Sequence, residues 1–281
     1  MQARALKNLM QLPVAKRLDA IAEGLELLVE HVTTLTDDLI YLTDVSRPRG
    51  ALMLEAQAQE EAAKVLILLD LVRLGWRDPL KVKVQIARFY DHLSRCIYAE
   101  VSTMRPADLA EVRRLIEDMR QAYYLDGPND VDWIFRNQLL SSREDGLYVD
   151  YVQYEDGAAW TTPAGRDVLG FRPDTAVQRL VIALHRLGVT SRRGLEVLAD
   201  TWAGQVIKDA TRWPVVANLN ARVLAQLDND GAASPDATDT DRRKVISRWT
   251  FPLHSLDLTE IDVKIKDLQE LRERRLAAQD W

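Results

Sequence analysis

Leucine, isoleucine and valine recur at spacings of three and four residues in the first part of the chain. Between residues 14 and 42 they fall at positions 18, 21, 25, 28, 32 and 35, which predicts one long amphipathic helix. The run from Ser46 to Gly50 contains a proline and a glycine and ends this pattern. A second helix is expected from Ala51 to Leu74, before Gly75, because glycine commonly follows the last turn of a helix.

Two further helices complete a four-helix pattern. The third is expected to start after Asp78-Pro79 and to run without a break, because one apolar stripe passes through Val82, Ile86, Phe89, Leu93 and Ile97. The fourth is expected from Ala107 to about Leu125, after Arg105-Pro106. Four long helices joined by short connections favour an antiparallel bundle, so the predicted fold class is all-α.

The pattern changes after residue 130. A short helix is expected over residues 131–140. The alternation from Gly146 to Tyr154, followed by Asp156-Gly157, predicts a small β-hairpin that closes near Trp160 and Pro163. Helices are expected again over residues 174–187, 191–207, 214–227 and 258–278. The chain should therefore divide into a helical bundle (1–145), a hairpin insertion (146–165), additional helices (166–227), a flexible acidic linker (228–241) and a C-terminal segment with a charged helix (242–281).

Composition narrows the class of protein. The chain has 281 residues, of which 47% are hydrophobic, so it can bury a sizeable core. The single cysteine, Cys96, cannot form an internal disulfide, and with no signal sequence visible at the N-terminus we expect a cytoplasmic protein. The longest apolar stretch, residues 65–72, is interrupted by Asp70, so no membrane association is expected. A net charge of −6 argues against a general nucleic-acid coat and confines any RNA contact to a local basic face.

Charged residues enter the second predicted helix where it is apolar on nearly every side. Glu61 falls in the row Leu54, Ala58, Glu61, Val65 and Leu68, where a lone carboxylate would be costly to bury. Lys64 is one turn from both Glu60 and Glu61 and can pair with either. One lysine cannot neutralise both glutamates, so a second cation from another helix is expected nearby.

The third predicted helix offers that cation. Arg88, His92 and Arg95 are spaced by four and three residues and are expected on one face, so they can meet the acids of the second helix. Two interpretations stay open. The charged groups form a buried ion-pair network that fixes the helix register, or His92 is a general acid or base and the arginines stabilise a phosphoryl transition state.

Three blocks of sequence occur in order: Ala58 to Lys64, Phe89 to Arg95, and Gly146 to Tyr151 ahead of Pro163. Together they resemble the AbiV-like abortive-infection branch of the HEPN superfamily, and the resemblance covers about residues 25–163. It implies an all-α HEPN bundle, a homodimer and a role in bacterial defence against phage. Many HEPN proteins are metal-independent ribonucleases, in which arginine and histidine of paired subunits meet in a cleft at the dimer interface.

The HEPN nuclease motif is an arginine followed by a histidine after four to six intervening residues. Arg88 and His92 have three residues between them. Arg136 resembles the start of such a motif, but serines stand where its histidine is expected. Arg179 and His185 have the right gap, but His185 follows an apolar run that is typical of a core position. The candidate catalytic residues are therefore His92, Arg95 and Arg88, with Glu60, Glu61 and Lys64 as supporting groups and Arg136, Arg179 and His185 ranked behind them.

The expected function is that of a growth-arresting effector of anti-phage defence. It would act on RNA or the translation apparatus, with a metal-independent endoribonuclease as one form. The alternative is a non-catalytic helical interaction protein, such as a sensor or a toxin-antitoxin component, whose charged network is structural. No cofactor or metal is expected, because the sequence holds no phosphate loop and no metal-ligand motif. The expected partners are a second copy of the chain, RNA or the translation machinery, and a phage or host protein as trigger.

Overall fold

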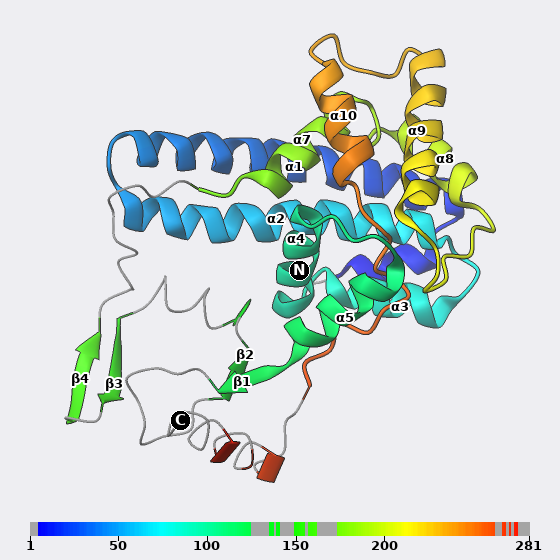
Figure 1. Cartoon of the computed structure of the whole chain (residues 1–281). Coiled ribbons are helices and arrows are strands. Elements are labelled where there is room, and N and C mark those ends of the chain that lie inside the picture. The colour runs from blue at the N-terminus through cyan, green and yellow to red at the C-terminus, as the bar shows by residue number, and fades with distance from the viewer. Residues whose placement is uncertain are drawn as a thin grey trace.

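Two long helices form the frame of the molecule. The computed structural model describes residues 5–124, 135–137, 139–140, 149–154, 157–161, 173–261, 266–267, 270 and 273–274. A short 3₁₀ helix, η1 (Ala5–Gln11), precedes α1 (Val14–Asp44), and α2 (Pro48–Leu74) returns beside α1 (Figure 1). The predicted stripe of α1 is buried, whereas α2 is buried on most sides of its second half, as an apolar helix in the middle of a bundle should be.

The third predicted helix is two helices. α3 (Pro79–Arg88) ends at Arg88, and α4 (His92–Thr103) begins after three intervening residues. Asp91 has an extended backbone, and its side chain accepts a hydrogen bond from the Ser94 amide at 2.7 Å, which makes it the N-cap of α4. The prediction of one unbroken helix was wrong because an aspartate able to cap a new helix lies within the apolar stripe. Arg88 and His92 therefore do not share a helix face.

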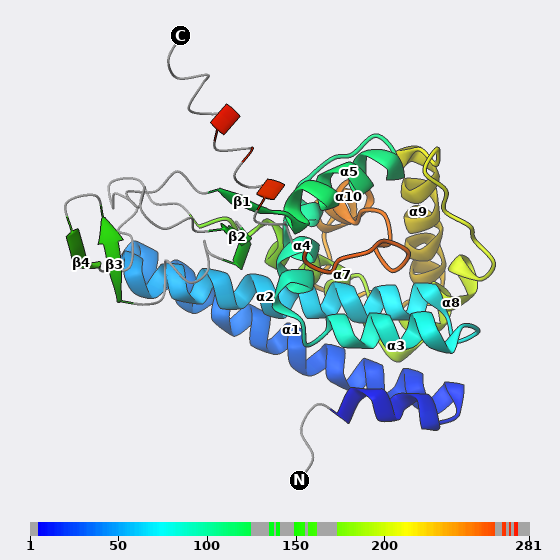
Figure 2. The ribbon, with the colours of Figure 1, turned by 90° about the horizontal axis from the view of Figure 1, so that it is seen from below.

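Short strands follow the next helix. α5 (Leu109–Arg120) ends before the predicted limit, and β1 (Ala122–Tyr124) pairs antiparallel with β2 (Phe135–Asn137), where we expected a short helix. Residues 131–134 of that expected helix lie outside the described residues. β3 (Asp150–Tyr154) and β4 (Gly157–Thr161) form the predicted antiparallel hairpin, with Tyr151 opposite Trp160. Figures 1 and 2 both place this hairpin at the end of the α1–α2 pair away from α8 and α9.

The C-terminal helices pack onto the same core. α7 (Ala176–Arg186) contacts α1, α2 and α4, and α8 (Arg192–Trp202) contacts α1 and α2. α9 (Trp213–Asn229) packs on α8, and α10 (Asp239–Arg248) packs on α7 and α9. The linker that we expected over residues 228–241 is shorter in the structure. α9 continues through Asn229, and Thr238 and Asp241 form a capping box at the start of α10.

The segment after α10 has no regular structure, yet it is buried. Trp249, Phe251, Leu253, Leu256 and Leu258 all belong to the core. Residues 258–261, where we expected the last helix to begin, are not helical, and most of residues 262–278 lie outside the described part of the chain. The fold is all-α apart from the two small strand pairs, as predicted. None of the described helices has the length and apolar character that crossing a membrane requires.

Candidate functional site

A buried carboxylate on α2 joins two residues of α4. Glu60 is 9% exposed, and its Oε2 lies 2.9 Å from His92 Nδ1 and 2.8 Å from Arg95 Nη1. His92 is the first residue of α4, and Arg95 follows three residues later, so the two side chains are neighbours on the helix surface and both reach α2. The predicted meeting of these acidic and basic residues is confirmed for Glu60, His92 and Arg95, which we call the Glu60 cluster.

His92 is the accessible member of the Glu60 cluster. Its side chain is 50% exposed, whereas those of Glu60 and Arg95 are nearly buried. A carboxylate only accepts hydrogen bonds, so the Nδ1 of His92 must donate to Glu60. In the neutral imidazole this leaves Nε2 as a proton acceptor. The pair can therefore exchange a proton with a bound molecule while the carboxylate stabilises the imidazolium that forms.

Arg95 is bound to protein acceptors on every side. Besides Glu60, its Nη2 donates to the Tyr90 carbonyl at 3.0 Å and its Nε donates to the Asp91 carbonyl at 3.3 Å. Each guanidinium nitrogen thus has an acceptor within the chain, and the side chain is 10% exposed. This geometry makes Arg95 the group that holds the α3–α4 connection against α2 and so positions His92.

Glu61 lies on a different side of α2 from the one we expected. It is partly exposed, and its Oε1 lies 2.5 Å from Lys64 Nζ. Lys64 Nζ in turn lies 5.4 Å from the centre of the Phe89 ring. Glu61 has the partner that its apolar surroundings require, with 15% of its side chain exposed, but the expectation that it meets His92 and Arg95 was wrong, because the neighbouring Glu60 occupies the interface with α4. Glu61 and Lys64 form a local pair beside the Glu60 cluster.

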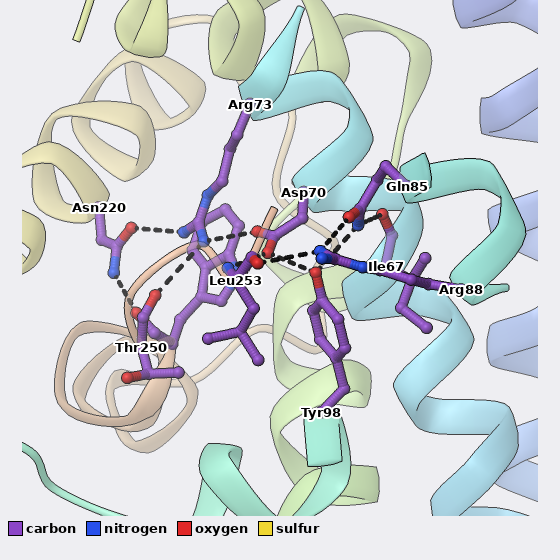
Figure 3. Close-up of polar contacts among 10 residues, drawn as sticks. Ile67, Asp70, Arg73, Gln85, Arg88, Tyr98, Asn220, Thr250 and Leu253 are labelled. Atoms are coloured by element: carbon purple, nitrogen blue, oxygen red, sulfur yellow. Dashed lines mark hydrogen bonds and ion pairs between the residues drawn. The ribbon is translucent and has the colours of Figure 1, made fainter. Parts of the chain in front are cut away.

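Arg88 belongs to another network. It is buried, and its guanidinium donates to Gln85 Oε1 at 2.9 Å and to the Leu253 carbonyl at 2.9 Å (Figure 3). It also donates to the Leu256 carbonyl. The prediction that Arg88 shares a face with His92 was therefore wrong. The break before Asp91 turns Arg88 toward the buried segment that follows α10.

Asp70 is the centre of that second network, and the sequence analysis noted it only as an interruption of an apolar stretch. Asp70 accepts hydrogen bonds from Arg73 at 3.1 Å, from the Tyr98 hydroxyl at 2.9 Å and from the Leu253 amide at 2.7 Å (Figure 3). Burial raises the pKa of Tyr98 well above its usual range and lowers the pKa of Arg73 to about 10. The available signal was an acid and a base at i and i+3 in a helix that is otherwise apolar all round.

The network has no room for a ligand. Arg73 stacks between the rings of Trp202 and Trp249, at 4.4 and 3.8 Å from their centres, and its Nη2 donates to Asn220 at 3.0 Å. The adjoining cavity, next to Asp70, holds no more than about one water molecule. These groups hold the last buried segment in place, and their role is structural.

Comparison with known proteins adds one finding. The HEPN_AbiV family model, described as AbiV, matches residues 20–174, more than half of the chain. The chain belongs to the AbiV family. This places it within the HEPN superfamily and, at the level of the family, among proteins of abortive infection against phage. No curated protein and no solved structure matches it. In this AbiV-family protein the match includes both halves of the Glu60 cluster.

Arg179 and His185 do not join the Glu60 cluster. Arg179 is exposed on α7, and five residues lie between it and His185, so the two lie on different helix faces. His185 Nδ1 lies 2.8 Å from Thr190 Oγ1, and burial lowers the pKa of His185. Arg136 lies in β2 opposite Tyr123. Within the ranges that the structure describes, no group of three histidine, cysteine or acidic side chains is arranged to hold a metal ion.

Proposed function

We propose that this AbiV-family protein is a growth-arresting effector of abortive infection and that His92 is its functional group. The observation that carries the proposal is the Glu60–His92 pair, in which a buried carboxylate orients a half-exposed imidazole. The stability of the fold does not require a buried carboxylate next to a half-exposed histidine. The arrangement has the geometry by which proteins prepare an imidazole for proton transfer.

RNA is the substrate class that this pair suits. In cleavage without a metal, Nε2 of His92 would accept the proton of a ribose 2′-hydroxyl while that oxygen attacks the adjacent phosphorus. The imidazolium would be stabilised by Glu60 and could return the proton to the leaving oxygen. The phosphorane also needs positive charge. Arg88, Arg95 and Lys64 are all held by acceptors of the chain, so a second subunit is the source that we propose.

Induced expression tests this function. Wild type, His92→Ala and the matched control His31→Ala, which changes an exposed histidine on α1, should be compared for growth, for the rate of protein synthesis and for new RNA ends. We expect wild type and His31→Ala to arrest growth and His92→Ala to lose the arrest while keeping the wild-type melting temperature. Growth arrest by folded His92→Ala would overturn the assignment.

A non-catalytic interaction protein is the second candidate. The observation in its favour is that every guanidinium nitrogen of Arg95, and both terminal nitrogens of Arg88, already bind acceptors of the chain, so neither arginine offers its end to a phosphate. In that case the charged groups only hold the bundle together. Growth arrest would then survive loss of His92, and no new RNA ends would accompany it.

The partners follow from the same proposal. We propose that the protein acts in the cytoplasm as a homodimer, on RNA or on the translation machinery, after a phage or host protein triggers it. A dimer doubles the few accessible basic groups near each His92 and so compensates for the acidic balance of the chain.

A further inference from the structure

The outer face of α3 carries an apolar ridge that nothing in the described structure covers. Leu80 is 77% exposed and Val84, one turn later, is 52% exposed. Ala87 continues the same face and is also exposed. The opposite face of α3, with Val82, is buried against the bundle. Leu80 and Val84 therefore form a continuous apolar strip on the exposed face of α3, which we call the α3 ridge.

Lysines flank this ridge on both sides. Lys81 and Lys83 are exposed on either side of Leu80 and Val84, and Arg77 is exposed just before the helix. α3 packs beside η1, which brings the exposed Lys7 to the same region, and Figure 2 shows η1 and α3 on one side of the molecule. In a chain whose net charge is −6, the α3 ridge is a local basic surface with an apolar centre. A surface that binds this ridge should carry acidic side chains around exposed apolar ones.

The outer face of α1 has that composition. Leu27 is 61% exposed and Tyr41 is 65% exposed, and both lie on the arc of the helix that also carries the exposed acids Glu23, Glu30, Asp37, Asp38 and Asp44. The sequence between Arg17 and Arg47 contains no lysine or arginine. None of these five acids forms an ion pair with another residue in the part of the chain that the structure describes. We call this arc the α1 acidic face.

We propose that two copies of this chain associate by placing the α3 ridge of each on the α1 acidic face of the other. The proposal deepens the homodimer put forward above and rests on it, but it does not depend on the role of His92. In a two-fold dimer the contact occurs twice, so each copy contributes both surfaces. Leu80 and Val84 pack against Leu27, and the lysines meet the carboxylates one turn before and after it, Glu23 and Glu30. Charge complementarity of this kind sets both the partner and the register.

The two charge patterns allow a test by exchange. One variant, Arg77→Glu/Lys81→Glu/Lys83→Glu, makes the α3 ridge acidic, and the other, Glu23→Lys/Glu30→Lys/Asp37→Lys, makes the α1 acidic face basic. Each variant alone meets like charge at both contacts of a homodimer. In a mixture, each contact again joins opposite charges, because the changed ridge meets the changed face and the native ridge meets the native face.

Light scattering coupled to size-exclusion chromatography measures the result against the chain mass of 32.0 kDa. We expect wild type and the control Val206→Asp, a change at an exposed valine elsewhere, to run as dimers. Each charge variant alone should run as a monomer, and their mixture should run as a dimer that dissociates as salt is raised.

Several results would overturn the proposal. If wild type is a dimer and either variant stays one, the dimer uses another surface. If the variants dissociate but their mixture does not reassociate, the ridge and the acidic face are not each other's partner, and the proposal is rejected. A monomeric wild type rejects both the surface and the homodimer, while the growth-arrest assay on His92→Ala still decides the function.

Discussion

Replacing Arg88 tests whether that residue holds the end of the chain rather than serving His92. Arg88→Met keeps most of the side-chain volume and removes the guanidinium. The Leu256 carbonyl and the Gln85 amide oxygen then lose their donor, whereas the Leu253 carbonyl keeps a hydrogen bond from the Leu256 amide at 3.0 Å. Each unsatisfied buried acceptor costs about 1–3 kcal/mol, and the relief of not burying a charge offsets part of the sum. With two such acceptors, we expect a net loss of about 2–4 kcal/mol of unfolding free energy.

Urea denaturation followed by circular dichroism measures this loss, and thermal melting should show a fall on the order of 10 °C for a chain of this size. Arg114→Met, at an exposed arginine on α5, is the matched control and should change stability by less than about 0.5 kcal/mol. A loss below about 1 kcal/mol for Arg88→Met would refute the role of Arg88 as the anchor of the segment after α10.

Two further predictions concern stability. Glu60→Gln should lower the free energy of unfolding by about 2–4 kcal/mol, because it leaves the charge of buried Arg95 without its counter-ion. The matched change Glu61→Gln, at a pair outside the contact with α4, should lower it by less than about 1 kcal/mol. Equal losses in urea denaturation would contradict the role of Glu60 as the counter-ion of Arg95. Burial of His254 lowers its pKa below the usual 6.5, so the unfolded chain binds this proton more readily than the folded one. Its contribution should reduce stability as pH falls below about 6.5, and His254→Gln should flatten the dependence of unfolding free energy on pH between 7 and 5; an unchanged slope would argue against that burial.

The helical pattern was predictable where one face of a helix is buried. The stripe of α1 and the start of α3 at Asp78-Pro79 follow from periodicity and capping. The break between α3 and α4 was not recognised, because Asp91 continues a helical pattern as easily as it caps a new helix. Only the packing of both helices on α2 decides between the two.

The candidate site was predictable in its membership but not in its details. The meeting of α2 with His92 and Arg95 followed from the short connection between the helices. Whether Glu60 or Glu61 faces α4 depends on how α2 is rotated about its own axis, which sequence spacing does not fix. The role of Arg88 could not be foreseen, since its acceptors are backbone carbonyls of Leu253 and Leu256, more than 160 positions later in the chain.

Replacement of His92 by glutamine measures the central claim most directly. Glutamine can still donate a hydrogen bond to Glu60 but cannot take up a proton, so the fold is kept and proton transfer is lost. Growth after induction should be compared for wild type, His92→Gln and the control His31→Gln at equal protein levels. We predict that only His92→Gln fails to arrest growth. Arrest by His92→Gln at the wild-type rate would contradict the account.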